Sequence, residues 1–322
     1  MRKKPPDAAA AASAASAPSA LPEPAAALLR RIEWTALRRL DGLLQGGFPT
    51  VSRGSGLDLA DLREYQPSDD VRHIDWNVTA RLDNPHVRVF TEDREMSACL
   101  IADGSGSMDF GSGTRTKRVV QTEFVALMAR LLTRHGNRVG GLLGGSGNAG
   151  WLPARGGREQ VMHLLQQLQL RRPAAAGDEG LAGWLQAAGR GLRRRSTVFV
   201  VSDFISPPGW ERPLARLAER HDVIAVRLVD ALEQSLPDVG LLTLRDAETG
   251  EQLLVDTHDR VFRQRFARAA AAREAALRES FAKAGADALE LTTACDLPDA
   301  IARFADLRRR RARRLASPAR TA

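Results

Sequence analysis

The fold is decided by the stretch SACLIADGSGSM, residues 97–108, in which an apolar strand runs directly into a polar loop with two glycines. The strand pattern extends from Met96 to Ala102 and carries no charge after Ser97. Such a run is typical of a strand that is buried on both faces of a sheet. A second apolar run, Thr197 to Ser202, resembles it and is also followed by an aspartate, Asp203.

Candidate strands alternate with candidate helices around this stretch. The predicted strands are 96–102, 138–143, 197–202, 223–228, 241–244 with 252–255, and 288–291. The predicted helices are 116–134, 158–170, 181–190, 213–220, 260–284 and 299–310. This alternation predicts an α/β fold, a doubly wound and mostly parallel sheet covered by helices on both faces. In such sheets, ligand sites lie at the carboxyl ends of the strands.

Composition divides the chain of 322 residues into four segments. We predict a disordered Ala/Ser/Pro tail over 1–24 and an amphipathic helix with an irregular or β elaboration over 25–94. The α/β domain follows over 95–307, and an Arg-rich tail over 308–322. No window approaches the roughly 20 apolar residues of a membrane-spanning helix. Only two cysteines occur, Cys99 and Cys295, so we expect a soluble protein of the reducing cytoplasm.

The chain is basic, with a formal net charge of +8 and arginine clusters at 193–195 and 308–314. A basic tail is compatible with nucleic-acid binding, which is one alternative function. However, residues 307–316 contain no aromatic side chain on which a base could stack. Arginines at a helix end also offset the helix dipole. Nucleic acid is therefore the less favoured partner.

The loop after the first strand offers three oxygen-bearing side chains, Asp103, Ser105 and Ser107. Hard cations such as Mg²⁺ take oxygen ligands, while a simple turn explains the same residues through hydrogen bonds to their own backbone. The loop by itself does not separate these two interpretations. Asp203 favours the metal, because two buried carboxylates at one sheet edge repel each other unless a cation or proton intervenes.

Asp103-x-Ser105-x-Ser107 after a strand resembles the metal-ion-dependent adhesion site of von Willebrand factor A domains, and Asp203 matches the later aspartate of that site. The segment LREYQPSDDVRHIDW (62–76), with Thr79-Ala80-Arg81, resembles the signature of the bacterial family called domain of unknown function 58. This resemblance implies a von Willebrand factor A-like fold. It also implies a magnesium or manganese ion and a MoxR-type AAA+ ATPase as a partner.

One feature of the sequence departs from the adhesion-site pattern. Adhesion-type sites also use a threonine from an intermediate loop, and the corresponding loop, 176–181, has none. We expect Asp178, Glu179 or a water to take its role, or the site to be weaker without it. The signature segment alternates charged residues around Tyr65 and Trp76, which predicts ion pairs shielded by aromatic rings. Such a network would hold the segment to the domain or, less simply, bind a partner.

Other catalytic patterns do not fit their context. Gly145-x-Gly147-x-x-Gly150 is followed by Trp151-Leu152-Pro153, which favours a hairpin over a dinucleotide-binding turn. The chain contains no Gly-x-Ser-x-Gly elbow, and Ser105 stands where an aspartyl phosphatase loop needs a second aspartate. We therefore predict a binding module that is not an enzyme. It would hold a partner or client carboxylate at the metal, and a metal-dependent hydrolase of phosphate esters is the alternative.

Overall fold

The computed structural model describes residues 23–36, 40, 58–66, 71, 74–82, 84–91, 97–147, 149–174, 178–245 and 251–316. The chain forms two compact units, Met1–Pro49 with Ser97–Ala322, and Thr50–Met96. The predicted tail, 1–24, lies outside the described residues except for 23 and 24. The N-terminal helix α1, Ala25–Thr35, belongs to the larger unit, so the predicted segment 25–94 is divided between the two units.

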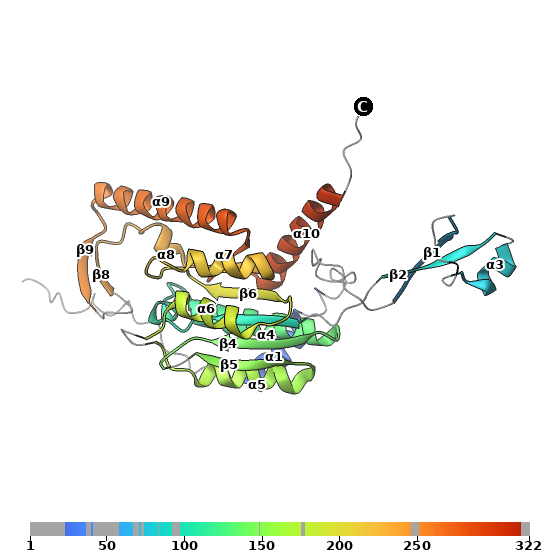
Figure 1. Cartoon of the computed structure of the whole chain (residues 1–322). Helices are drawn as coiled ribbons and strands as arrows, with labels where there is room; N and C mark the ends of the chain where they lie inside the picture. Colours follow the sequence, from blue (N-terminus) through green and yellow to red (C-terminus); the bar gives the residue numbers. More distant parts are fainter. Residues whose placement is uncertain are drawn as a thin grey trace, which may run out of the picture. The chain divides into compact units, whose positions relative to one another are not determined.

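The larger unit contains a six-stranded sheet in the order β10-β7-β6-β3-β4-β5 (Figure 1). Its strands are β3 (Ser97–Ala102), β4 (Arg138–Leu143), β5 (Gly150–Arg155), β6 (Thr197–Ser202), β7 (Asp222–Val229) and β10 (Asp287–Thr292). All neighbours are parallel except β4 and β5. Numbered along the chain, this sheet has the order 3-2-1-4-5-6 of doubly wound folds. The predicted fold class, an α/β domain with a mostly parallel sheet, is confirmed.

Helices cover both faces of the sheet, as the apolar strands require. The helices are α4 (Lys117–Arg134), α5 (Gly157–Leu170), α6 (Leu181–Gly191), α7 (Glu211–Arg220), α9 (Arg260–Ala284) and α10 (Leu297–Ala316). Alternate strand residues enter different cores: Leu100 joins the core of α1, α4, α5 and α10, and Cys99 and Ile101 join that of α6, α7 and α9. The two-residue period of a strand explains this division.

Two predicted features differ from the structure, and a third, a hairpin, is confirmed. Strands β8 (Leu241–Arg245) and β9 (Gln252–Asp256) pair with each other and do not extend the main sheet. The edge strand β5 was expected only as part of a hairpin, and that hairpin is confirmed by its antiparallel pairing with β4. Helix α10 continues to Ala316, beyond the predicted helix end at 310 and across the predicted boundary at 308. Arg308 is buried and forms ion pairs with Asp222 and Asp287.

The smaller unit contains an antiparallel ribbon, β1 (Asp58–Glu64) with β2 (His86–Thr91), and helix α3 (Trp76–Leu82). Asp75 begins this helix by accepting a hydrogen bond from the Val78 amide at 3.2 Å. Trp76 is 70% exposed, and the expected shielding of charges by aromatic rings stays a prediction. The signature residues 67–70, 72 and 73, including Asp69, Asp70 and Arg72, lie outside the described part of the chain.

Candidate metal-binding loop

Asp103 and Asp203 follow neighbouring parallel strands, β3 and β6, and therefore meet at one edge of the sheet. The Asp103 amide donates to the Val201 carbonyl at 3.0 Å and extends the ladder by one residue. Both carboxylates are almost fully buried, with Asp103 1% and Asp203 0% exposed. The prediction that both carboxylates lie at the same edge is confirmed.

The loop after β3 folds back around the Asp103 carboxylate. The Ser105 amide donates to Asp103 Oδ1 at 2.8 Å, and the Ser202 hydroxyl donates to Asp103 Oδ2. The hydroxyl oxygens of Ser105 and Ser107 lie 3.0 Å apart. A short 3-10 helix, η2 (Gly106–Asp109), carries Ser107 and ends the loop. Three of the predicted ligands, Asp103, Ser105 and Ser107, are thus brought together.

The loop requires glycine at position 104 because two backbones approach each other there. A Cβ atom at Gly104 would lie 2.2 Å from the carbonyl carbon of Gly144, at the end of β4. The Gly104 carbonyl also accepts a hydrogen bond from the Ala174 amide at 2.7 Å. Arg118, in the first turn of α4, donates to the Ser105 carbonyl at 3.0 Å from the other side. The backbone of the loop is therefore held on several sides.

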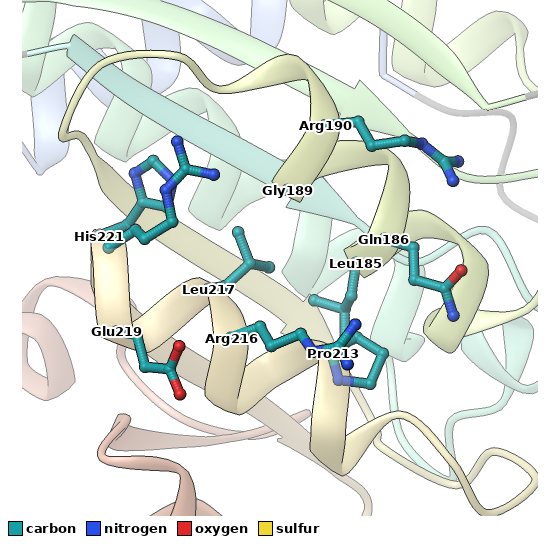
Figure 2. Close-up of a pocket in the computed structure, with 10 residues that line it drawn as sticks. Leu185, Gln186, Gly189, Arg190, Pro213, Arg216, Leu217, Glu219 and His221 are labelled. Atoms are coloured by element: carbon teal, nitrogen blue, oxygen red, sulfur yellow. The ribbon is translucent and has the colours of Figure 1, made fainter.

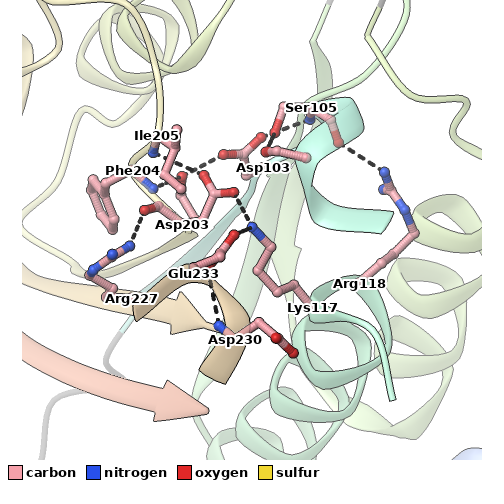
Figure 3. A network of polar contacts seen from close by, with 12 residues as sticks. Asp103, Ser105, Lys117, Arg118, Asp203, Phe204, Ile205, Arg227, Asp230 and Glu233 are labelled. Atoms are coloured by element: carbon pink, nitrogen blue, oxygen red, sulfur yellow. Dashed lines mark hydrogen bonds and ion pairs between the residues drawn. The ribbon is translucent and has the colours of Figure 1, made fainter. Parts of the chain in front are cut away.

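A buried lysine contacts the second carboxylate of the pair. Lys117 begins α4, and its ammonium donates to Asp203 Oδ2 at 2.5 Å and to Glu233 Oε1 at 2.6 Å (Figure 3). The residue is 0% exposed. Glu233 lies on the short helix α8 (Ala231–Gln234), where it also accepts from the Asp230 amide in a capping box. Lys117 is thus a built-in cation at the edge where the sequence predicted a metal ion.

Sequence reasoning missed Lys117, Glu233 and Ser202 as parts of this site. Ser202 directly precedes Asp203, so its place at the strand end was a usable signal. Lys117 stands at a helix start, where a lysine is ordinarily solvated, and its partners are 86 and 116 residues away. No local sequence pattern predicts the burial of such a lysine.

Burial raises the pKa of Asp103, and repulsion from the Asp203 carboxylate adds to the rise. Hydrogen bonds from Ser202 and Ser105 act in the opposite direction but do not cancel it. Lys117 is bonded to Asp203 and not to Asp103. Of the two carboxylates, Asp103 is therefore the one whose negative charge a bound cation or a proton would stabilise most.

The donor set of the loop fits a small hard cation. Two neighbouring ligands of an octahedral Mg²⁺ ion, at metal–oxygen distances of about 2.0–2.1 Å, lie about 2.9 Å apart. The spacing for Ca²⁺, at about 2.4 Å, would be about 3.4 Å. The Ser105 and Ser107 hydroxyls lie 3.0 Å apart, which is equally a hydrogen-bond length. The spacing of these two oxygens thus matches that of neighbouring Mg²⁺ ligands.

The candidate metal ligands of the loop are hydroxyl groups more than carboxylates. Within the described part of the chain, no group of three or more His, Cys, Asp or Glu side chains is arranged to hold a metal ion. Asp178 is half-buried and lies two residues before Gly180, the N-cap of α6. Residues 175–177, next to it, are outside the described set. The ligand role predicted for Asp178 stays a prediction, and Glu179 is exposed.

The fold and the loop together define a class of protein. Its members are α/β domains with a 3-2-1-4-5-6 sheet and an Asp-x-Ser-x-Ser loop at the carboxyl edge of that sheet. The model of the family described as "Protein of unknown function DUF58" matches residues 61–276, and the chain belongs to this family. The uncharacterized protein Rv1480 of Mycobacterium tuberculosis is 40% identical over 288 residues, which cover 88% of this chain and 90% of that protein. The resemblance drawn from the signature segment is confirmed.

Solved structures with a similar fold include BatB from Bacteroides thetaiotaomicron, a conserved hypothetical protein. It is 11% identical, with a TM-score of 0.40, and the match covers 67% of this chain and 99% of that one. The SpRpn10 VWA domain is 13% identical, with a TM-score of 0.35, and the match covers 65% of this chain and 94% of that one. None of the helices in the described residues is long and apolar enough to cross a bilayer.

Proposed function

We propose that this chain is a metal-dependent protein-interaction module and not an enzyme. Asp103, Ser105 and Ser107 would hold one Mg²⁺ or Mn²⁺ ion, with Asp203 in support. The observation that carries the proposal is the 3.0 Å spacing of the two serine hydroxyls beside a buried aspartate that is bonded to no cationic side chain of the described residues. When bound, the ion would supply a positive charge to which a partner's oxygen can bind.

The chemistry of the loop favours a carboxylate from the partner. Two of its three ligands are neutral hydroxyls, and the negative charge of Asp203 is engaged by Lys117. Asp103 alone offsets only part of a divalent charge. Mg²⁺ ordinarily keeps several waters, and a partner's Asp or Glu can replace one of them. The docked surface would then be recognised through the ion as well as by its shape.

The proposed partner is a MoxR-type AAA+ ATPase, or a client protein that both bind during assembly or maturation. This part of the proposal rests on the family resemblance. The 322 residues contain no Gly-x-x-x-x-Gly-Lys-Ser/Thr motif, so the energy of nucleotide hydrolysis would come from the partner. We propose that this takes place in the cytoplasm, in keeping with the low cysteine count.

Thermal unfolding with and without Mg²⁺ tests the metal site. A ligand that binds only the folded state adds about 2.7 kcal/mol of stability at one hundred times its dissociation constant. We expect Mg²⁺ and Mn²⁺ to raise the Tm of the wild type, and Asp103→Ala to abolish the increment. Ser107→Ala should reduce it, whereas Ser235→Ala, at an exposed position after α8, should not. An unchanged Tm for the wild type at millimolar metal would contradict the proposal.

Partner binding is tested by calorimetry with the ATPase, in Mg²⁺ and in chelator. By linkage, the metal must tighten the complex by the same factor by which the complex tightens the metal. Equal affinities in both conditions would exclude a metal-bridged contact. Turnover of a phosphate ester that is lost in Asp103→Ala would favour the hydrolase instead.

A further inference from the structure

A cavity of about 540 Å³ lies between α6 and α7, among residues that the metal-binding loop does not use. Its floor is apolar, with Leu185 0% and Leu217 2% exposed. Figure 2 shows the labelled side chains of the two helices around this floor. His221, the residue that follows α7, lines the cavity next to the start of β7. This volume lies in the range of small-molecule sites.

The His221 end of the cavity is at the opposite edge of the sheet from the metal-binding loop. Thr197, at the start of β6, pairs with Asp222, at the start of β7, and His221 directly precedes that pair. Asp103 and Asp203 follow the other ends of β3 and β6. Because the strands are parallel, the amino and carboxyl edges are separated by the length of a strand. A ligand in the cavity would therefore be distinct from one at the loop.

The rim of the cavity is strongly basic. Arg190 comes from α6, and Arg216 and Arg220 come from α7, while Glu219 is the one carboxylate among the lining residues. All three arginines are exposed, and none of them forms an ion pair with a described residue. Arg190 and Arg220 lie in last turns, where a cation offsets the helix dipole. Offsetting a helix dipole does not explain Arg216, and it does not explain His221, which lines the same cavity.

His221 is the polar group that points to a ligand. It is 4% exposed, and neither ring nitrogen has a hydrogen-bond partner among the described residues. A neutral imidazole offers one donor and one acceptor, and leaving both unpaired in a protein interior is costly. Both nitrogens are closed to solvent, so a ligand can reach them only after a neighbouring side chain has moved. Rotamer changes are fast for exposed residues.

We propose that this cavity is a binding site for a small organic oxyanion, a phosphate or carboxylate group carried on an apolar body. Arginine guanidinium groups bind such oxyanions through paired, charge-assisted hydrogen bonds. The imidazole N–H of His221 donates to the same group, and the apolar body rests on Leu185 and Leu217. The arginines and the histidine would thus bind the charged end of one amphipathic ligand. The apolar floor would contact its other end.

Titration calorimetry of the full chain tests the site with three probes: inorganic phosphate, benzyl phosphate and phenylacetate. Ionic strength is kept constant with chloride. We expect benzyl phosphate to bind at least about tenfold more tightly than inorganic phosphate, because the benzyl group adds apolar burial. A comparison of benzyl phosphate with phenylacetate identifies the favoured oxyanion. No binding of any probe above the chloride background would overturn the proposal.

Variants separate this cavity from general surface charge. Arg216→Gln/Arg220→Gln should weaken benzyl phosphate binding at least about tenfold, because two charge-assisted contacts are lost. Arg268→Gln, at an exposed position of α9, should leave it unchanged. His221→Phe retains the aromatic volume and should also weaken binding about tenfold. Equal affinity in the wild type and in the arginine double variant would overturn the proposal, and Tm values show that each variant folds.

Discussion

Lys117 and Asp203 form a buried ion pair at the carboxyl edge of the sheet, with Nζ and Oδ2 2.5 Å apart and neither side chain more than 1% exposed. Glu233 is the second partner of the same ammonium, at 2.6 Å. A charge removed from water in this way is tolerated only when it is paired and hydrogen-bonded. The lysine therefore decides both the stability of this edge and the charge that Asp203 can offer to a metal ion.

Replacing the lysine tests the first of these roles. Lys117→Met keeps the length of the side chain but leaves Asp203 and Glu233 without their shared cation. We expect a loss of about 3–5 kcal/mol in the free energy of unfolding, as is usual when one partner of a buried pair is removed. Lys283→Met is the matched control, because Lys283 is 74% exposed and forms only an i,i+4 pair with Glu279.

The control should change stability by no more than about 0.5 kcal/mol. Urea unfolding curves of the three proteins provide the comparison. If both variants lost the same small amount, the Lys117 ammonium would not be the buried charge that the structure describes.

The close approach of two loops predicts a strong effect of a single methyl group. In Gly104→Ala the new Cβ would lie 2.2 Å from the Gly144 carbonyl carbon, and backbone cannot move aside as a side chain can. We expect a loss of at least about 2 kcal/mol, from overpacking. Gly113→Ala, where the structure leaves open space, should stay within about 0.5 kcal/mol. Near-wild-type stability of Gly104→Ala, measured in urea, would show that the loops are not held together.

Asp230 predicts a pH dependence in the acid range. Burial alone would raise its pKa, but hydrogen bonds from Ser112, Thr293 and the Leu232 amide outweigh burial and lower it. A lowered pKa means that the folded state binds the proton less readily than the unfolded state. This stabilisation is complete above the ordinary value of 3.8 and is lost as the pH falls through the lowered pKa.

Asp230→Asn should therefore be less stable than the wild type at pH 7. The difference should shrink as the pH falls below 3.8. Urea midpoints between pH 7 and pH 2 measure it. Two parallel curves over the whole range would show that the carboxylate is not stabilised in its charged form.

His221 predicts a second pH dependence, nearer to neutrality. Burial lowers the pKa of this imidazole, and the charges of Arg220 and Arg195 lower it further. The unfolded state then binds more protons just below the ordinary value of 6.5, so stability decreases as the pH falls from 6.5 through the lowered pKa.

In His221→Phe this contribution disappears, and the loss of stability between pH 7.5 and pH 5 should be smaller than in the wild type. His163→Phe, at an exposed position of α5, should retain the wild-type dependence. Urea midpoints at the two pH values measure this pH dependence for each protein. Identical pH dependence in His221→Phe and the wild type would contradict a neutral, buried imidazole.

Much of the fold was predictable because its signals are local. Residues 97–102, 138–143 and 197–202 were predicted as strands almost to the residue, and helix 260–284 was predicted with its observed bounds. Apolar runs of strand length and apolar positions at helical spacing follow from the geometry of each element alone. The separation of β8 and β9 from the main sheet was not predictable, because either run could equally have joined that sheet.

The α/β fold and the Asp103, Ser105 and Ser107 loop could be predicted from the sequence, because strand periodicity and loop composition are properties of neighbouring residues. The shared edge of Asp103 and Asp203 was also predictable, since parallel strands end together. The burial of Lys117 against Asp203 and Glu233, and the position of His221 in a cavity lined by arginines, became visible only in the folded chain. Burial of a charge depends on what packs around it, and those groups come from segments that are distant in sequence.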